Sequence, residues 1–558
     1  MRLPSLVLLV LMLVPARGRG DDLQGLGRDF WAWRELHQPI SNDDVPRISR
    51  PHAWRPDFSR EALSSVTKDL AAFEDRWRAL APGKGARVAA EVDYRLVGSA
   101  LARVRWELEG VRSHRRDPGF YVQQTVGALV DLLLPSSPWT EERGHDVVVR
   151  LQAFPRILAD AEENLDEIVE PFSQLAIADL HDIGPRLKAS MGALGPSLAP
   201  DQRAPLAAAS EAAVSALDSY RAWLLAHPGS GKVPIGRDAY SSFLRRVALI
   251  PYTPEEILAM GRQEWARTIA AEAYEARRNE GAPELPLFPD QESQIKKARE
   301  DEGAVRLFLE EKGILSVPTW MRHYGYRPLP SALEPLAGFG EGTDFTPAPG
   351  PEGDSTRYIP KPSPSLGYFA LSMAKDPRAD MVHEGIPGHG FQIALSRHHE
   401  DELRRHWVDS GINEGLGFYC EEMMLAMGLF DDSPRSREMI WNYARLRALR
   451  VEVDVRLALG TFTIDEAARY LEQAVPMDKE TARSEAASFA SDPGFAIDYQ
   501  IGKLQITKFL AEARQQQGTS FDLRKFHDYL FKNGNVPVAL QRWELLGLRD
   551  EVDRLEAH

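Results

Sequence analysis

The sequence contains almost no cysteine, since Cys420 is the only one among 558 residues. A single thiol cannot form an internal disulfide bond, so the fold must depend on its apolar core for stability. Hydrophobic residues make up 43% of the chain and charged residues 27%. This composition is ample for a folded core.

Positive charge is also in short supply. The chain has 82 acidic against 67 basic residues, a net charge of -15, and no concentrated run of Lys or Arg. Binding to nucleic acid requires a basic surface that neutralises phosphates. We therefore expect no nucleic-acid partner.

Long hydrophobic runs are missing except at the start of the chain. The run Leu6–Val14 follows a basic residue and precedes small residues at Ala16 and Gly18, a pattern typical of a secretory signal peptide. The run is too short to span a bilayer. Residues 1–20 are therefore predicted to be a signal peptide, with a buried helix or a membrane anchor as the alternative. Because no cysteine follows for lipid attachment, we expect a periplasmic or extracellular protein without stable membrane insertion.

Helical spacing dominates the region from about Asp29 to Glu280. Apolar residues in the segment 93–111 fall on one helical stripe, which consists of Leu96, Ala100, Leu101, Val104 and Leu108. Pro155 predicts a break or kink in the helical segment 150–172. Thr253 with Glu256, and Thr463 with Glu466, have the spacing of a capping box and predict two helix starts.

Glycine and proline are concentrated between Pro318 and Ser365, which excludes a long helix there. The spaced Gly338, Gly340 and Gly342 resemble a phosphate loop, but no Gly-Lys-Ser/Thr follows, so a solvated loop is favoured. The stretches "STRYIP" (355–360) and "LGYFAL" (366–371) are predicted to be short strands beside a cleft.

The motif "HEGIPGH" places His383 and His389 six residues apart. On an unbroken helix, this spacing separates the two side chains by about 120° and roughly 9 Å, too far to share one metal ion. Pro387 removes a helical hydrogen bond and Gly388 tolerates unusual dihedral angles. Two residues looped out within 386–388 would bring both imidazoles onto one face, so the motif predicts a metal site.

A hydrolytic zinc site needs three protein ligands, an open position, and a carboxylate that accepts a proton from water. His383 and His389 are the first two predicted ligands, and Glu384 is the predicted general base. Glu414 follows His389 by 25 residues and is the predicted third ligand. Glu421, seven residues further on, is expected to accept a hydrogen bond from a ligand histidine. An ordinary acidic helix face is the alternative for both glutamates.

Other residues compete for the metal. His398, His399 and His406 are rival ligands, but they lie in the charged run "SRHHEDELRRH", which is typical of a solvated surface. Cys420 could bind a soft metal, although a packed apolar thiol is the favoured interpretation.

These motifs together resemble the bacterial domain of unknown function 885 family over roughly residues 29–555. The first family motif, H-E-x-I-P-G-H, is complete in this chain. The second, E-G-W-A-x-Y-x-E, corresponds to "EGLGFYCE" from Glu414, and the third, an R-x-x-R segment, corresponds to "RALRVEVDVRLA" from Arg447. The last, P-G-Q-A-x-x-Y-x-x-G, corresponds to "PGFAIDYQIGK" from Pro493. The resemblance implies a mainly α, large helical zincin-like fold with a deep central cleft and a small β element.

The resemblance also implies roles for further residues. Tyr499 matches the tyrosine of the last motif and is expected to donate a hydrogen bond to an oxyanion. Arg447 and Arg450 are expected to pair with Asp454, or one of them to hold a peptide carboxylate. The chain departs from the family at Leu416 (tryptophan in the family), Phe495 (glutamine) and Ala458 (histidine), which puts efficient turnover in question.

We therefore predict a signal peptide (1–20), an N-terminal helical region (21–285) and a C-terminal catalytic region (286–558), which together form one continuous fold. The expected function is that of a secreted zinc-dependent hydrolase of short peptides with Zn²⁺ as cofactor. The alternative is a catalytically impaired, metal-containing protein that binds peptides or serves as a scaffold.

Overall fold

The structure is a computed structural model. It describes residues 22–41, 48, 50–135, 138–339, 343–344, 355–407, 409–475 and 477–557. The predicted signal peptide lies outside these residues, as do Gly340 and Gly342. Within the described ranges, no helix is long and apolar enough to cross a membrane.

The first half of the chain is entirely helical in its described elements. These are α1 (Leu23–His37), α2 (Arg60–Ala79), α3 (Val88–Arg105), the π-helix η1 (Trp106–Val111), α4 (Ser113–Arg116), α5 (Pro118–Val122), the π-helix η2 (Gln123–Gly127), α6 (Ala128–Leu133), α7 (Glu141–Asn164), α8 (Glu170–Asp179), α9 (Ile183–Leu194), the 3-10 helix η3 (Gly195–Ser197), α10 (Pro200–Ala226), α11 (Arg237–Arg246) and α12 (Pro254–Arg278).

The second half adds three short strands to a further set of helices. Its elements are α13 (Gln291–Glu311), β1 (Gly325–Pro328), the 3-10 helix η4 (Glu334–Leu336), β2 (Thr343–Asp344), β3 (Thr356–Ile359), α14 (Tyr368–Met373), α15 (Arg378–Glu384), α16 (His389–Arg397), α17 (Glu402–His406), α18 (Ser410–Ala426), α19 (Pro434–Leu459), α20 (Ile464–Ala474), α21 (Lys479–Ser491), α22 (Phe495–Gln517), the 3-10 helix η5 (Gly518–Ser520), α23 (Leu523–Lys532), α24 (Val538–Leu546) and α25 (Asp550–Glu556).

The mainly helical class and the small β element are thereby confirmed. The sheet has the order β1-β3-β2, with β1 parallel and β2 antiparallel to β3. The predicted strand at "STRYIP" is β3, whereas the strand predicted at "LGYFAL" is wrong, because this stretch forms α14. A short apolar run fits a strand and a buried helix equally well. Here Tyr368 and Phe369 pack against Tyr443 of α19, which favours the helix.

The capping predictions are confirmed. Of the break or kink predicted at Pro155, the break does not occur. Thr253 and Thr463 each form a complete capping box at the start of α12 and α20. Helix α7 continues through Pro155, whose ring is exposed to solvent. The missing N–H therefore costs one backbone hydrogen bond but causes no clash with the core.

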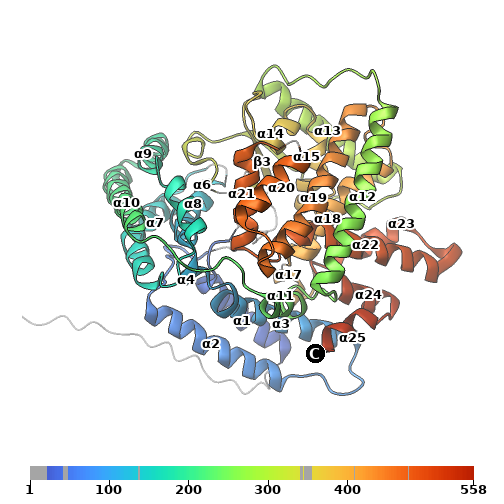
Figure 1. The fold of residues 1–558 in the computed structure, drawn as a ribbon, viewed down its shortest axis with the longest axis horizontal. Coiled ribbons are helices and arrows are strands. Elements are labelled where there is room, and N and C mark those ends of the chain that lie inside the picture. Colours follow the sequence, from blue (N-terminus) through green and yellow to red (C-terminus); the bar gives the residue numbers. More distant parts are fainter. Residues whose placement is uncertain are drawn as a thin grey trace, which may run out of the picture.

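Two groups of helices stand side by side in Figure 1, where α6 to α10 lie on the left and α12 to α22 on the right. Helices α7 and α10 pack together in the first group. In the second group, α18 packs on α22 and α12 packs along α19. Helix α12 belongs to the predicted N-terminal region, so the packing crosses the boundary predicted at residue 285.

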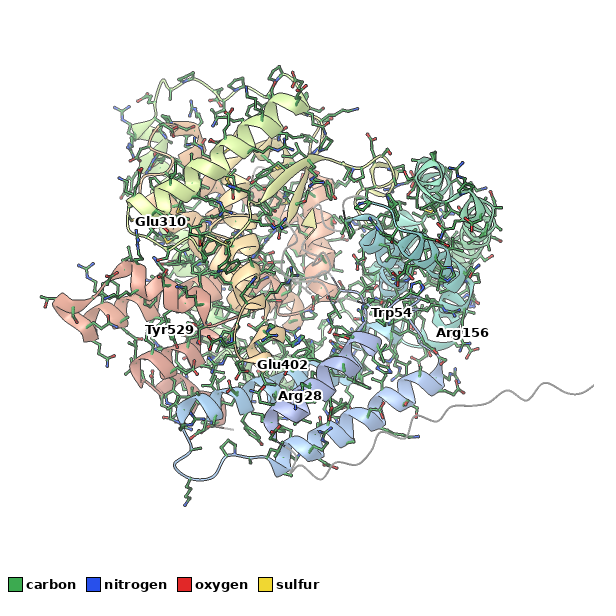
Figure 2. The ribbon with its side chains drawn as sticks, turned by 180° about the vertical axis from the view of Figure 1, so that it is seen from behind. Arg28, Trp54, Arg156, Glu310, Glu402 and Tyr529 are labelled. Carbon is green, nitrogen blue, oxygen red and sulfur yellow. The ribbon has the colours of Figure 1, made fainter. Side chains whose placement is uncertain are left out.

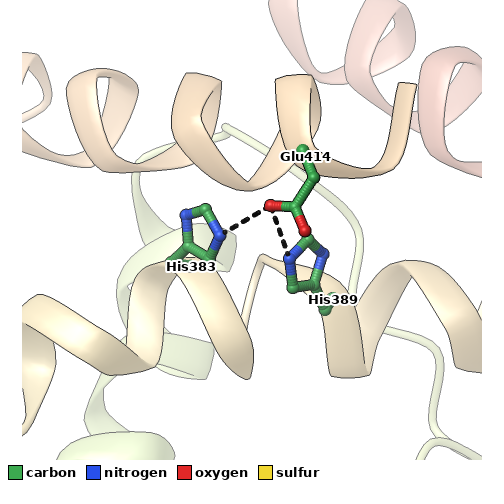
Figure 3. A group of neighbouring side chains, drawn as sticks. All are labelled: His383, His389 and Glu414. Carbon is green, nitrogen blue, oxygen red and sulfur yellow. Dashed lines mark hydrogen bonds and ion pairs between the residues drawn. The ribbon is translucent and has the colours of Figure 1, made fainter. Parts of the chain in front are cut away.

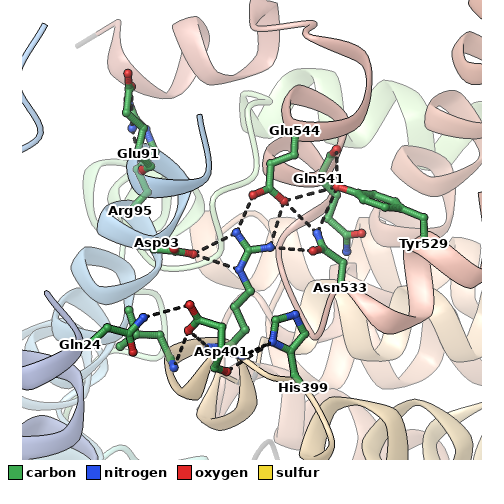
Figure 4. A network of polar contacts seen from close by, with 12 residues as sticks. Gln24, Glu91, Asp93, Arg95, His399, Asp401, Tyr529, Asn533, Gln541 and Glu544 are labelled. Atoms are coloured by element: carbon green, nitrogen blue, oxygen red, sulfur yellow. Dashed lines mark hydrogen bonds and ion pairs between the residues drawn. The ribbon is translucent and has the colours of Figure 1, made fainter. Parts of the chain in front are cut away.

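Buried charge joins the N-terminal helices to the C-terminal half. The Arg404 guanidinium of α17 lies 3.0 Å from Asp93 of α3 and 2.5 Å from Glu544 of α24. Figure 4 shows Asp93 at the left of this network and Glu544 at its top. Nearby, Arg28 of α1 pairs with Glu402 at 3.5 Å, on the face shown in Figure 2. The Arg404 ion pairs thus link α3 to the half of the chain that carries the motif "HEGIPGH".

A buried histidine makes the stability of this half depend on pH. His527 of α23 has no exposed surface; its Nδ1 lies 2.8 Å from the carbonyl oxygen of Ile314 and its Nε2 2.8 Å from the Tyr419 hydroxyl. An Nδ1–H that donates to the carbonyl leaves Nε2 to accept from the phenol, so the ring is neutral. Burial lowers the pKa of His527 to about 4.

We expect His527 to contribute to acid unfolding. The unfolded chain, with a pKa near 6.5, binds the proton more readily than the folded chain, so this stability is present above about pH 6.5 and is lost as pH falls toward 4. Chemical unfolding should show a loss of about 2.5 kcal/mol between pH 7 and pH 4.5 that His527→Gln lacks. Equal losses in both proteins would contradict the assignment.

Candidate metal centre

The motif "HEGIPGH" joins two helices. Helix α15 ends at Glu384 and α16 begins at His389, so the prediction of one helix with two looped-out residues is wrong in form. The connecting backbone is hydrogen-bonded at both ends: the amides of Gly385 and Ile386 donate to the Met381 carbonyl, and the Phe391 amide donates to the Gly385 carbonyl. These bonds satisfy helix ends that would otherwise be unpaired.

This connection requires glycine at position 388, because the backbone leaves no space for a Cβ atom there. A Cβ atom at residue 388 would lie 1.7 Å from the carbonyl oxygen of His383 and 2.3 Å from its carbonyl carbon. Both atoms belong to the backbone and cannot move aside as a side chain could. The absence of a Cβ therefore brings the start of α16 against the end of α15, with one histidine on each helix.

The three predicted ligands meet at one point (Figure 3). A carboxylate oxygen of Glu414, on α18, lies 3.2 Å from Nε2 of His383 and 3.4 Å from Nε2 of His389. All three residues are buried, and one ligand atom from each lies within 4.8 Å of the other two. In the described part of the chain, this is the one group of three or more such side chains that could hold a metal ion.

The spacing fits a tetrahedral metal ion. Two ligands held at about 2.05 Å with a tetrahedral angle between them are roughly 3.3 Å apart. The two histidine–glutamate separations are close to this value. Two imidazoles and a carboxylate also form a donor set found in zinc hydrolases with an open coordination position.

Glu421 fixes the orientation of His383. Its carboxylate lies 2.7 Å from Nδ1 of His383, on the opposite side of the ring from Glu414. Nδ1 donates this hydrogen bond, which leaves Nε2 available as a ligand. Burial lowers the pKa of His383, but the hydrogen bonds to Glu414 and Glu421 raise it to about 9 in the metal-free chain. Burial raises the pKa of Glu414, yet the two imidazoles hold it well below its usual range.

Close packing on the other side of His383 requires a second glycine. A Cβ at Gly417 of α18 would lie 2.9 to 3.1 Å from three atoms of the His383 ring. The ring thus lies directly against the helix that carries Glu414 and Glu421. This contact explains how one helix supplies both a ligand and the residue that orients another ligand.

Glu384 is the last residue of α15 and lies beside the ligand group. Burial raises its pKa, but Arg357 and the two histidines lower it, and the net pKa is below the usual value. The carboxylate is therefore ionised, as a general base must be. Arg357, a partly buried residue of β3, also pairs with Asp380 at 2.6 Å. The sequence analysis missed Arg357, although an arginine within an apolar strand was a usable signal.

Tyr499 contacts the ring of His383, one of the three predicted ligands. Its ring stacks on His383 with centroids 6.1 Å apart and an angle of 18° between the planes. Tyr499 is on α22, and Asp454 of α19 holds the start of that helix by accepting from the amides of Gly494 and Ala496. Asp454 also accepts from the Tyr240 hydroxyl at 2.9 Å, and burial raises its pKa to about 7.

The predicted pairing of Asp454 with the two arginines is wrong. Arg447 pairs with Glu421 at 2.8 Å, and Arg450 pairs with Glu485 of α21. A helix places residues three or four positions apart on one face, but the neighbouring helices decide which partner each side chain meets. Arg447 and Arg450 point to two different carboxylates from two different helices.

The rival ligands lie elsewhere. His398 and His406 are exposed and stack on Trp320 and Trp31, and His399 accepts from the Asp401 amide. Cys420 is fully buried, and burial raises the pKa of its thiol well above the usual value, so it is protonated and packed in the core.

The three residues that depart from the family pattern have different surroundings. Leu416 is buried in the core around α18. Ala458 lies in an apolar cluster with Val451, Val455 and Ile497. Phe495 packs edge-on against Tyr499 with ring centroids 5.7 Å apart, so this departure directly touches a candidate catalytic side chain.

The fold and the site define a mainly helical protein with a buried His-His-Glu group that could hold a metal ion. The chain belongs to the family described as bacterial protein of unknown function (DUF885), whose model matches residues 50–545. A search of the curated proteins found no match.

Solved structures that share this fold have low sequence identity to this chain. A candidate lipoprotein of unknown function from Shewanella oneidensis matches with a TM-score of 0.70 and 16% identity, over 94% of this chain and 100% of that chain. A candidate lipoprotein from Colwellia psychrerythraea matches with a TM-score of 0.68 and 17% identity, over 96% of this chain and 99% of that chain. At these identities the likeness concerns the fold alone.

Proposed function

We propose that the protein is an exported zinc peptidase of the zincin type that acts on short peptides. The observation that carries the proposal is the convergence of His383, His389 and Glu414 with the ionised Glu384 beside them. Zinc, when bound, polarises a peptide carbonyl and lowers the pKa of a coordinated water molecule. Glu384 takes a proton from the attacking water and passes it to the leaving amine. Tyr499 donates a hydrogen bond to the oxyanion that develops.

A large cavity that reaches Phe495 favours a peptide as substrate, although none of the three predicted ligands lines it. It measures about 660 Å³, and residues from both halves of the chain line it, including Trp54, Phe172, Ser488 and Phe495. The volume is within the range of small-ligand sites. Phe495 also contacts Tyr499, so the cavity wall lies two ring contacts from His383. We propose that it forms part of a deep cleft that receives the peptide.

Export is proposed on two grounds. The start of the sequence has the pattern of a signal peptide, and the two structures of similar fold are described as candidate lipoproteins. We therefore propose a periplasmic or extracellular location.

A second candidate function is a metal-containing protein that binds peptides without cleaving them. The changes at Leu416, Ala458 and Phe495 favour it, because the family pattern has tryptophan, histidine and glutamine there. Loss of one hydrogen-bond donor to the transition state can reduce the rate by about 10²- to 10³-fold.

One experiment separates the two functions. The purified protein is expected to hold about one zinc per chain by elemental analysis, and His389→Ala is expected to hold none, because two ligands do not make a stable site. Both proteins are then incubated with a mixture of short peptides and the products are identified by mass spectrometry. New fragments from the wild-type protein alone support the peptidase. Peptide binding at full zinc occupancy without fragments favours the binding protein, and a wild-type protein without zinc refutes both.

A further inference from the structure

Arg447 is a buried cation that lies next to the metal centre without touching the ligands. Its side chain on α19 is 5% exposed and forms an ion pair with Glu421 at 2.8 Å. The same carboxylate oxygen of Glu421 lies 2.7 Å from Nδ1 of His383. Arg447, Glu421 and His383 therefore form a continuous chain from α19 through α18 to α15.

Arg447 is the positively charged partner of the buried Glu421 carboxylate. Glu421 has no exposed surface, and a charged group removed from water needs a partner of opposite charge. Arg447 supplies that charge at the same carboxylate oxygen that His383 contacts. A carboxylate held by a guanidinium has a fixed position, so the imidazole that donates to it is fixed as well.

Aromatic rings fix the guanidinium itself. Its central carbon lies 5.3 to 5.8 Å from the centroids of four rings, which belong to Tyr443, Phe418, Tyr499 and Phe369. Among the described residues, its Nε and Nη1 have no hydrogen-bond acceptor. Ring faces attract a cation in place of such acceptors. Tyr499 also stacks on His383. Arg447 therefore contacts two residues, Glu421 and Tyr499, that each contact His383.

We propose that Arg447 is a positioning residue of the metal centre, which holds Glu421 so that His383 is correctly oriented as a ligand. The inference rests on the proposed function, because it assumes that the group of His383, His389 and Glu414 binds zinc. It adds a residue from a helix that contributes no ligand.

Arg450 provides a matched control. It lies one turn along the same helix, is also buried, and contacts two of the same rings, those of Tyr499 and Phe369. Its ion-pair partner is Glu485, which does not contact His383. Replacing either arginine by methionine therefore removes a buried cation from the same environment, but only one replacement releases Glu421.

The test measures the zinc affinity of the full-length protein by competition with a chelator. Arg447→Met is expected to bind zinc about 10- to 100-fold more weakly than wild type, the usual cost of losing a residue behind a metal ligand. Arg450→Met should bind zinc within about twofold of wild type, and Arg447→Lys, which keeps the charge, should recover part of the loss. Equal weakening in both methionine variants would show a general packing effect and overturn the proposal.

A double-mutant cycle tests whether Arg447 acts through Glu421. Glu421→Gln removes the buried negative charge, so the double variant with Arg447→Met buries neither charge and is expected to fold even if the single variant does not. In the Glu421→Gln background, adding Arg447→Met should change zinc affinity by less than about threefold. A further loss of zinc affinity as large as that in the wild-type background would show that Arg447 does not act through Glu421. Wild-type protein that binds no zinc would refute the proposed function itself, whereas zinc-binding wild type with an equally tight Arg447→Met would refute only this inference.

Discussion

Replacing Glu384 by glutamine is expected to lower kcat/KM for peptide hydrolysis by about 10³-fold while zinc stays bound. Glutamine has nearly the same shape but cannot accept a proton from water, and proton transfer by a positioned side chain contributes roughly 10² to 10⁴ to enzymatic rates. Glu384 is not one of the three residues whose ligand atoms converge. Its replacement should therefore remove proton transfer and leave the metal site intact.

The measurement combines steady-state kinetics on a peptide that the wild-type protein cleaves with elemental analysis of the same samples. Glu402→Gln is a suitable control, because Glu402 lies in a surface ion pair with Arg28 and such pairs contribute little. It should retain wild-type kinetics. Undiminished cleavage by a zinc-loaded Glu384→Gln protein would exclude Glu384 as the base.

Much of the site could be predicted from the sequence because its signals are local. His383, Glu384 and His389 lie within seven residues, and Pro387 and Gly388 between them exclude a continuous helix. Glu414 and Glu421 are seven residues apart, two turns of helix, so both face the same direction on α18. Local rules of this kind do not require knowledge of which helices are neighbours.

The remaining contacts could not be predicted because they depend on tertiary packing. Arg447 meets Glu421 because α19 packs on α18, and Asp454 instead binds the start of α22. Arg357 reaches the site from a strand 27 residues before Glu384, and no sequence periodicity relates the two. The form of the connection between α15 and α16 was also missed, since composition predicts a disruption of the helix but not where each helix ends.

The packing also explains why a metal-binding motif of seven residues occurs in so large a chain. Two of the predicted ligands depend on neighbouring helices: His383 packs against Gly417 and bonds Glu421, and Glu414 is on a helix that packs against α22. The start of α22 is in turn held by Asp454 of α19. A zinc site with three ligands on three helices requires all these helices to be fixed relative to one another, because ligand distances tolerate only about 0.2 Å.

Gly388→Ala is expected to have a large effect, because among the glycines of the described residues an added Cβ makes its closest contact here. The new Cβ would lie 1.7 Å from the His383 carbonyl oxygen, so the end of α15 and the start of α16 must separate. We expect a loss of about 3 kcal/mol or more in the free energy of unfolding. Zinc affinity should fall by more than roughly 100-fold, beyond the cost of losing a residue behind a ligand, because the two histidines move apart.

Gly192→Ala is the matched control for this prediction. Gly192 is exposed within α9, and an added Cβ there would meet no atom within 4 Å. Alanine in an exposed helix should be neutral or stabilising by up to about 1 kcal/mol. Chemical unfolding and zinc competition on both variants decide the matter: if Gly388→Ala matched Gly192→Ala in stability and zinc affinity, the close approach of the two helices could not be what brings the histidines together.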